Sequence, residues 1–501
     1  MEQGSWVAEP SRVPGRYAAP SAEPDDRLRM SDVGRLARRA RRRIVRTARF
    51  DERPTFPRML AEHLQSDLDE LEVVEESWPP YDLVNVQVGL DAWLAEDGVR
   101  HELVGMRNHR HYDFGFGDLL RLPDNPHYPQ PEPGNVAWTQ LAVGPNGEQT
   151  STALSGVYLV TADSTDDEPP TRLAMMLRAA DPESGMGLVQ LHLVADRPGA
   201  AAEVAATIRR LAIEHNVFRG QVISFSHDMF GERASALQFH RRPDVSADQV
   251  ILPAETLATI RRQVVGVAEH RDALLAARQH LKRGLLLYGP PGVGKTHSVR
   301  FLIGQMTDVT IVELSGDSLR AIGTACSVAR TLQPAMIVIE DVDLIAEERE
   351  MYGGASPLLF ELLNEMDGLA EDTDIVFLLT TNRADMLEPA LAARPGRVDQ
   401  AVALELPDED ARRQLFALYR GDLDVDESNL DAVIERTDGV TASFLKELLR
   451  RAALIAAEAN GGGGRLAVSA DQLDAALDEL MDTRNAMTRT LLGGRGKEDL
   501  D

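Results

Sequence analysis

The segment Gly289–Thr296, GPPGVGKT, has the residue types needed to bind a chain of phosphates. Its glycines let the backbone curl so that successive N–H groups point at one anion, and the N-terminus of a following helix adds positive potential. The segment matches G-x-x-x-x-G-K-[ST] in full and follows an apolar run, Leu285–Tyr288. Lys295 would reach the terminal phosphates, and the Thr296 hydroxyl would ligate Mg²⁺.

Two adjacent acids, Glu340 and Asp341, end another apolar run, Met336–Ile339. Parallel strands end at the edge of the sheet where ligands gather, so these acids would lie beside the phosphate loop. One carboxylate can hold the Mg²⁺ shell and the other can polarise an attacking water. The glutamate comes first, which reverses the usual order, and a misplacement of about 1 Å can cost ~100-fold in rate. The sequence therefore predicts an active but slow hydrolase.

Three more polar residues follow the next apolar run, IVFLLTT. Asn382 stands at its end, where an amide can orient a water against the γ-phosphate. Arg394 and Arg397 flank a Pro-Gly pair and could reach the γ-phosphate of a neighbouring subunit. An isolated surface arginine is usually only a solvated charge, so these two depend on the rest of the pattern.

The elements that must position these residues alternate between strand and helix. Residues 249–406 follow this alternation, which predicts a parallel sheet flanked by helices. Residues 407–486 are mainly helical, and 487–501 read as a flexible tail. We therefore expect an α/β class protein, with an αβα nucleotide domain followed by a small helical lid.

A separate α+β domain is expected over residues 53–248. The stretch MLAEHLQSDLDELEVV looks helical, and GVYLVTA, RLAMMLRAA and GLVQLHLVA look like strands. A helix over Ala200–His215 leads into QVISFS, which suggests a strand–helix–strand finish. The histidines of this region are scattered, so we expect surface or core positions and no metal site. Its expected role is to bind a client or adaptor.

Residues 1–52 are expected to be a disordered arm with a basic segment. The cluster Arg35–Arg49 carries apolar residues at roughly helical spacing. Two interpretations stay open for it. It is either a solvated arm, which could fold back on the acidic body, or a docking helix for an acidic partner, anionic lipid or nucleic acid.

Composition excludes several classes of function. The 501-residue chain carries a formal net charge of −27, which repels nucleic-acid phosphates and makes a nucleic-acid partner unlikely. The single cysteine, Cys326, rules out an intramolecular disulfide and a multi-cysteine metal site. The first residues lack the apolar core of a signal peptide, and the apolar runs are too short to span a membrane. We therefore expect a cytoplasmic protein.

Five motifs occur in the order and spacing of the AAA-type ATPases, and the chain resembles that family over residues 250–485. The motifs are GPPGVGKT, IVIEDVD, ELLNEMDGL, TTNRADMLEPAL and ARPGRVDQ. The resemblance implies a ring, most simply a homo-hexamer, that binds ATP and Mg²⁺.

The resemblance also implies roles for single residues. Glu340 and Asp341 occupy the two Walker B positions, with Glu340 and Thr296 on the metal. Asn382 matches sensor 1, and Arg394 and Arg397 match the arginine fingers. The nucleotide contacts it implies are Gly289, Pro290, Pro291, Gly292, Val293, Gly294, Lys295, Thr296, His297, and on the lid Gly439 and Thr441.

The chain departs from the family's unfolding members at the pore. Those members carry an aromatic–hydrophobic–glycine loop, and here the nearest match is Ala321-Ile322-Gly323, without the aromatic. Tyr352, in MYGG after the acids, is a second candidate for a pore residue or an ordinary exposed loop. Threading of an extended polypeptide by aromatic grip is therefore not favoured.

Three functions are compatible with these features. The first is a ring ATPase that uses ATP to remodel, disassemble or translocate a protein client. The alternative is a slow ATP-dependent scaffold, an assembly switch or chaperone for a larger complex, which the reversed acids and the weak pore loop favour. A nucleic-acid motor that works through the Arg35–Arg49 cluster is the third, and the acidity of the chain argues against it.

Overall fold

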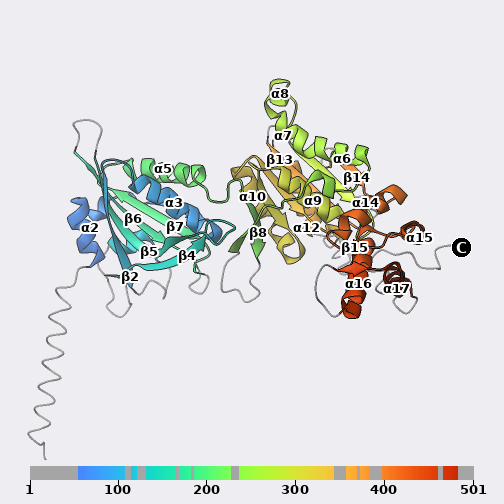
Figure 1. Cartoon of the computed structure of the whole chain (residues 1–501). Helices are drawn as coiled ribbons and strands as arrows, with labels where there is room; N and C mark the ends of the chain where they lie inside the picture. The colour runs from blue at the N-terminus through green and yellow to red at the C-terminus, as the bar shows by residue number, and fades with distance from the viewer. Residues whose placement is uncertain are drawn as a thin grey trace, which may run out of the picture. The chain divides into compact units, whose positions relative to one another are not determined.

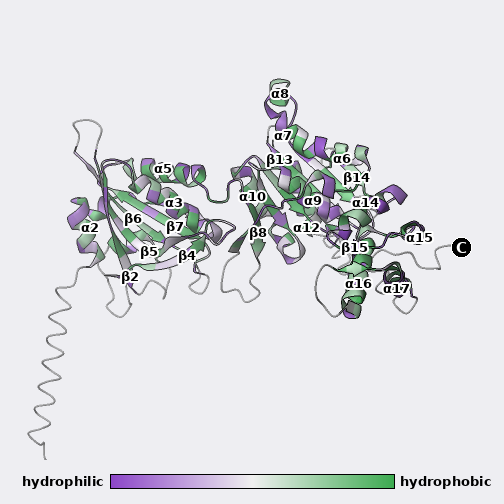
Figure 2. Ribbon diagram, in the orientation of Figure 1, coloured by the Kyte–Doolittle hydropathy of each residue, from purple (hydrophilic) through white to green (hydrophobic). Residues whose placement is uncertain are grey.

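Figure 1 shows the fold of the chain in a computed structural model. The structure describes residues 55–107, 114–120, 131–163, 169–181, 186–226, 236–343, 357–368, 370, 373–383, 398–460 and 466–482. Figure 2 shows hydrophobic residues on many strands and an alternation of hydrophobic and hydrophilic residues along most helices.

A seven-stranded sheet organises the N-terminal region. Its order is β1-β7-β6-β5-β2-β3, with β4 paired to β5, and all the pairs are antiparallel. β5 contains one of the three stretches expected to be strands, and β6 and β7 cover most of the other two. The strands are β1 (Val74–Trp78), β2 (Val99–Arg107), β3 (Glu132–Gly134), β4 (Ala137–Ala142), β5 (Gln149–Ala162), β6 (Thr171–Arg178) and β7 (Val189–Ala195).

Helices cover both faces of this sheet. α3 (Leu83–Leu94) and α5 (Ala200–Glu214) pack over one face, around a core that includes Leu90 and Ile208. α2 (Phe56–Leu64) and α4 (Phe116–Leu120) cover the other face. The mixture of helices with an antiparallel sheet agrees with the α+β expectation for this region.

One local prediction for the N-terminal region was wrong, and another holds with a different pairing of its strands. MLAEHLQSDLDELEVV was expected to form one helix, but the helix ends at Leu64, because Gln65 has a left-handed φ of 54°. A short 3₁₀ turn, η1 (Leu68–Glu70), then precedes β1. The expected strand–helix–strand finish is present as β7, α5 (Ala200–Glu214) and β8 (Val222–Ser226), but its two strands belong to different sheets. β7 belongs to the first sheet, whereas β8 belongs to the second.

The second sheet also has seven strands, in the order β14-β10-β13-β12-β11-β8-β9. Six strands run parallel and β9 is antiparallel, so the expected parallel sheet gains one antiparallel edge strand. The central strands are nearly continuous apolar runs, which is typical of a parallel sheet that helices cover on both faces. Besides β8, the strands of this sheet are β9 (Ala236–His240), β10 (Arg283–Tyr288), β11 (Thr310–Leu314), β12 (Ala335–Ile339), β13 (Ile375–Thr381) and β14 (Gln400–Ala403).

The hairpin β8–β9 lies upstream of residue 249, where we expected the nucleotide domain to begin. β8 pairs in parallel with β11, with Ser224 beside Glu313. Two strands of the preceding segment thus extend the nucleotide-domain sheet. The boundary at 248 was drawn from composition, which carries no information on pairing between distant strands.

Helices lie on both faces of the second sheet. α9 (Lys295–Gln305) packs against one face through Val299, Phe301 and Leu302. α10 (Ile322–Thr331) and α12 (Pro357–Asp367) pack on the other. The remaining elements before or between the strands are η4 (Ala247–Gln249), α6 (Ala254–Arg261), the π-helical η5 (Arg262–Gly266), α7 (Val267–Glu269), α8 (Arg271–Ala276) and η6 (Gly316–Ala321).

A buried ion pair lies at the end of this sheet where β10 and β13 begin. Arg283 Nη1 donates to Asp374 Oδ1 at 3.0 Å, and both side chains are almost fully buried. The same guanidinium donates to the carbonyls of Leu281 and Val264. Burial lowers the pKa of Arg283, and Asp374 opposes that shift. The Asp374 carboxylate therefore stabilises the charge of the Arg283 guanidinium, which burial has removed from water.

The C-terminal helical region has its own core, which includes Phe416, Phe444 and Leu477. It agrees with the expected helical lid, with one addition, a two-stranded parallel sheet of β15 and β16. The elements are α14 (Glu409–Arg420), β15 (Asp424–Val425), α15 (Leu430–Arg436), α16 (Ala442–Asn460), β16 (Ala467–Val468) and α17 (Ala470–Met481). Among the helices that the structure describes, none combines the length and apolar character needed to cross a bilayer.

Cys326 should resist alkylation in the folded protein. Its side chain is fully buried on α10, and burial raises the pKa of the thiol to about 12. The reactive thiolate is therefore scarce at about pH 8. We expect iodoacetamide at that pH to leave Cys326 unmodified by mass spectrometry and to modify it fully in denaturant. Rapid labelling without denaturant would contradict this burial.

Candidate functional site

Three left-handed glycines shape the loop between β10 and α9. Gly289, Gly292 and Gly294 have φ angles of 149°, 83° and 108°. A Cβ atom at Gly289 would lie 2.2 Å from the carbonyl oxygen of Leu404, so only glycine fits there. Gly294 is the N-cap residue of α9 and supplies no capping side chain. The loop and the helix N-terminus can thus offer backbone N–H groups to an anion.

Lys295 lies inside the curve of this loop. Its Nζ donates to the carbonyl oxygens of Gly289 and Pro290 at 2.8 and 2.9 Å, and to Asn382 Oδ1 at 2.7 Å. Burial lowers the pKa of Lys295, while the charges of Asp341 and Asp343 raise it. The ammonium is therefore held in place by the two segments predicted to meet around the phosphates.

Thr296 and Glu340 come together from α9 and the end of β12. Thr296 Oγ1 donates to Glu340 Oε2 at 3.2 Å. Burial raises the pKa of Glu340, as do the charges of Glu313 and Asp341, whereas Thr296 and Arg300 lower it. A hydroxyl and a carboxylate oxygen at this separation are the ligands that Mg²⁺ prefers.

Asp341 and Asn382 face each other across β12 and β13. Asn382 Nδ2 donates to Asp341 Oδ1 at 3.2 Å, and the Asp341 N–H donates to Thr380 Oγ1 at 3.1 Å. Asp341 has a left-handed φ of 52°, which aspartate adopts more readily than most residues. The four predicted polar residues Lys295, Glu340, Asp341 and Asn382 thus belong to one connected site.

Asp343 was missed as a member of this site. It is buried, and its Oδ1 accepts from Thr381 Oγ1 at 2.9 Å and from the Asn382 N–H at 3.4 Å. Those bonds fix the end of β13 and hence the Asn382 side chain. Asp343 is the second aspartate of the EDVD segment that drew attention to Glu340 and Asp341, but the spacing did not show that its side chain would be buried.

The helical lid contacts the phosphate loop directly. The Ser443 N–H donates to the Gly292 carbonyl at 3.1 Å, and a Cβ at Gly292 would lie 3.0 Å from the Thr441 and Ser443 side chains. Gly439 has a left-handed φ of 73°, and the Thr441 side chain is fully buried. Ser443, which was not predicted, is the residue that joins lid and loop.

His297 lies on the exposed side of α9. Its Nε2 is 2.9 Å from the Gln249 carbonyl oxygen, so the imidazole is tied to the segment before α6. Pro290, Pro291 and Val293 complete the loop, and Val293 packs into the core beneath it. Arg394, Arg397 and Tyr352 lie outside the described residues.

The residues present fit a nucleotide with a magnesium ion. The curled backbone, Lys295 and the start of α9 suit a triphosphate, and Thr296 with Glu340 suits the ion. Across the part of the chain that the structure describes, no group of three or more acids, histidines or cysteines could hold a metal by itself. The ion would therefore take its further ligands from phosphate oxygens and water.

Residues 285–406 match the family model of the "ATPase family associated with various cellular activities (AAA)". The segment that carries the site is thus an AAA-type ATPase domain. The match begins at β10 and ends after β14, so the AAA family model covers the phosphate loop, the acids and Asn382 but not the β8–β9 hairpin.

Curated proteins are similar to this chain over the AAA domain and its surroundings. The ATP-dependent zinc metalloprotease FtsH of Thermus thermophilus is 34% identical over 248 residues, 44% of this chain and 39% of that protein. The proteasome-activating nucleotidase of Methanopyrus kandleri is 30% identical over 239 residues, 45% of this chain and 54% of that protein. The 26S protease regulatory subunit 6A of Caenorhabditis elegans is 29% identical, with 56% of it covered. The chain thus spans between about two fifths and just over half of these relatives.

The nearest match to a pore loop in this AAA domain was wrong. Ile322 begins α10, and its side chain is fully buried in the core with Val312, Leu319 and Ile337. A residue in that position cannot grip a polypeptide. The match rested on the hydrophobic–glycine pair alone, because the aromatic residue of the pattern is missing.

Proposed function

We propose that the chain hydrolyses ATP and uses it, as a ring of identical subunits, to remodel, disassemble or translocate a protein client. The observation that carries this proposal is the single site formed by Lys295, Thr296, Glu340, Asp341 and Asn382, with the lid bonded to the same loop. The names of the relatives, proteases and proteasome-associated ATPases, support a protein client.

Each residue of the site has a proposed role. The loop backbone and Lys295 bind the phosphates, and Thr296 with Glu340 holds Mg²⁺, which would neutralise charge on the phosphate oxygens. Asp341 polarises the attacking water, and Asn382 orients that water. Gly439 and Thr441 are proposed to contact the nucleotide from the lid. Arg394 and Arg397 are proposed to serve the neighbouring subunit.

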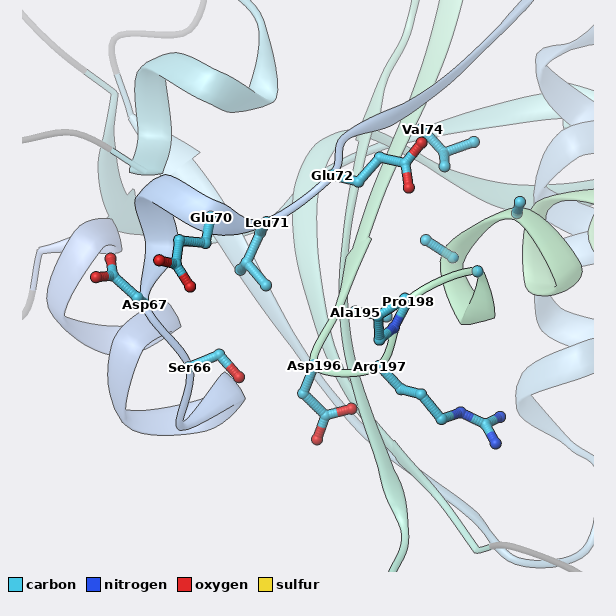
Figure 3. Close-up of a pocket in the computed structure, with 13 residues that line it drawn as sticks. Ser66, Asp67, Glu70, Leu71, Glu72, Val74, Ala195, Asp196, Arg197 and Pro198 are labelled. Carbon is cyan, nitrogen blue, oxygen red and sulfur yellow. The ribbon is translucent and has the colours of Figure 1, made fainter.

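The N-terminal α+β domain is proposed to bind the client or an adaptor. A cavity of about 330 Å³ lies in that domain, between the segment around η1 and the turn from β7 into α5 (Figure 3). Leu71, Val74, Ala195 and Pro198 give it apolar walls, and Asp67, Glu70, Glu72 and Asp196 surround them with carboxylates. We place the protein in the cytoplasm and keep the domain limits 53–248, 249–406 and 407–486 as proposals, with β8 and β9 of the first segment joining the sheet of the second.

A slow ATP-dependent assembly switch is the second candidate. The burial of Ile322 favours it, because the described residues of the AAA domain then offer no hydrophobic grip at that position. In this function ATP would hold a scaffold together and hydrolysis would release it. The nucleic-acid motor has no support from the described residues.

Size-resolved light scattering with ATP and Mg²⁺ tests the ring. We expect a closed oligomer, with a hexamer as the simplest form, and a steady ATPase rate that a true client raises. A monomer under these conditions would contradict both the remodelling ring and the scaffold. An oligomer whose ATPase ignores every client, but whose disassembly follows hydrolysis, would favour the switch.

A further inference from the structure

Arg242, just after β9, holds four backbone carbonyls with one guanidinium. Its Nη1 donates to the carbonyl oxygens of Ile303 at 2.8 Å and Met306 at 2.7 Å. Its Nη2 donates to those of Gly220 at 2.9 Å and Val309 at 3.0 Å. Arg242 lies upstream of the segment that the family model covers, and the roles proposed above do not use it.

Two of these carbonyls belong to the C-terminal end of α9, the helix that begins with Lys295 and Thr296. Ile303 lies in its last turn, and Met306 is its C-cap residue. The last carbonyls of a helix lack partners within it and carry the negative end of its dipole, so a guanidinium is a favourable donor there. The other two carbonyls come just before β11 and two residues before β8. One side chain therefore holds the end of α9 against the starts of two strands.

Close packing holds the segment after β9 against the same end of α9. A Cβ atom on Gly304 would lie 2.7 Å from the Pro243 carbonyl oxygen, so any larger residue would push the two segments apart. The approach to β8 is bonded to β11 as well, because the Gly220 N–H donates to Thr310 Oγ1 at 3.0 Å. The end of α9 far from the phosphate loop is therefore fixed by residues that flank the β8–β9 hairpin.

The hairpin continues directly from the N-terminal α+β domain. A short connection joins the end of α5 to the start of β8. Arg219, in this connection, donates to the carbonyl oxygen of Ile213 in α5 at 3.2 Å and to that of Gln333, before β12, at 3.3 Å. A displacement of α5 would therefore reach β8 and the segments that Arg242 holds together.

We propose that Arg242 is a positioning residue for ATP binding, which holds α9 so that Lys295 and Thr296 stay at the phosphates. A helix is a rigid element, so a shift at its C-terminal end is carried to its first residues. The β8–β9 hairpin then links the N-terminal domain to the nucleotide site. This inference rests on the proposed roles of Lys295 and Thr296.

Arg242→Gln should raise the KM for ATP about tenfold and change kcat less than about threefold, because α9 presents its first residues less firmly to the phosphates. A merely structural role has another signature, since partial unfolding lowers the apparent kcat and leaves the KM unchanged. Arg242→Lys keeps a cation at the helix end but cannot span four carbonyls, so its KM should lie between the two. Arg241→Gln is the matched control and should keep the wild-type KM. Arg241 is exposed and makes no hydrogen bond or ion pair with the residues that the structure describes.

Hydrogen exchange tests the link to the N-terminal domain. In the wild type, saturating ADP with Mg²⁺ should slow exchange in peptides from α5 at least about twofold, because binding at one end of a coupled unit stabilises the other. At saturating ADP, the Arg242→Gln variant should keep the protection of its phosphate loop and lose the protection of α5.

The outcomes separate this inference from the proposed function. A wild-type chain that neither binds nor hydrolyses ATP would refute the proposed function itself. In an active chain, a wild-type KM for Arg242→Gln, or an equal rise in KM for Arg241→Gln, would refute the role of Arg242 alone. Exchange of α5 that ignores ADP in the wild type would refute the link through the hairpin. If Arg242→Gln does not fold, Arg242→Lys carries the test, and a wild-type KM in that variant would refute the role.

Discussion

Asp341→Asn is expected to lower the ATPase kcat by a factor of 100 or more, on the order of the losses seen when a group acting on the attacking nucleophile is removed. Asparagine keeps the size of the side chain and can still accept the bond from Asn382 Nδ2. Like aspartate, it tolerates the left-handed φ of 52° at this position. The substitution therefore removes the charge and leaves the turn in place. Steady-state hydrolysis of ATP measures the effect.

Nucleotide binding supplies the control for this experiment. Lys295, Thr296 and the glycine loop are unchanged in the Asp341→Asn variant, so its affinity for a fluorescent ATP analogue should stay within about threefold of the wild type. A variant that binds ATP but does not turn it over can also trap a client for identification. Hydrolysis at the wild-type rate would show that another group polarises the water.

Asp374→Ala is expected to destabilise the AAA domain by about 3–5 kcal/mol, the cost of leaving one member of a buried ion pair without its partner. Arg283 would remain buried with backbone carbonyls as its described acceptors. The expected result is a large drop in the urea midpoint of the transition that reports on this domain. The ion pair lies at the opposite end of the strands from the phosphate loop, so ATP affinity should be kept wherever the variant is folded.

The exposed ion pair between Arg413 and Asp431 is the control for the buried pair of Arg283 and Asp374. Asp431 accepts from Arg413 at 2.7 Å, but its side chain is 89% exposed. Asp431→Ala should therefore leave the urea midpoint nearly unchanged, since solvent screens such pairs. Asp374→Asn, which keeps a hydrogen-bond acceptor, should fall between the two. Equal midpoints for Asp374→Ala and Asp431→Ala would mean that Arg283 finds another partner.

The sequence predicted those residues of the site whose chemical role is marked by a pattern of nearby residues. The glycines around Lys295 are required by the curl of the loop, and apolar runs before Glu340 and Asn382 require buried strands. These features are encoded within a few residues. The residues that the sequence reasoning missed, Asp343 and Ser443, act through burial or through contacts with distant segments. Their types are common, so nothing local distinguishes them.

The organisation of the chain was less predictable because strand pairing is a long-range property. QVISFS was expected as a strand, but no local signal could say that it would pair with β11 about ninety positions later. Ile322 was misread because Ala321-Ile322-Gly323 was only the nearest match to a pore-loop pattern. In the structure, η6 and α10 place the Ile322 side chain in the core.

The left-handed turn at Asp341 has a consequence for how this protein could change over evolutionary time. A chain that exchanged the two acids would put the longer glutamate on the left-handed residue, where aspartate and asparagine are favoured. It would also put the shorter aspartate opposite Thr296. Exchanging the two acids would therefore cost on the order of 1–2 kcal/mol in backbone strain at this position, in addition to moving the carboxylate opposite Thr296.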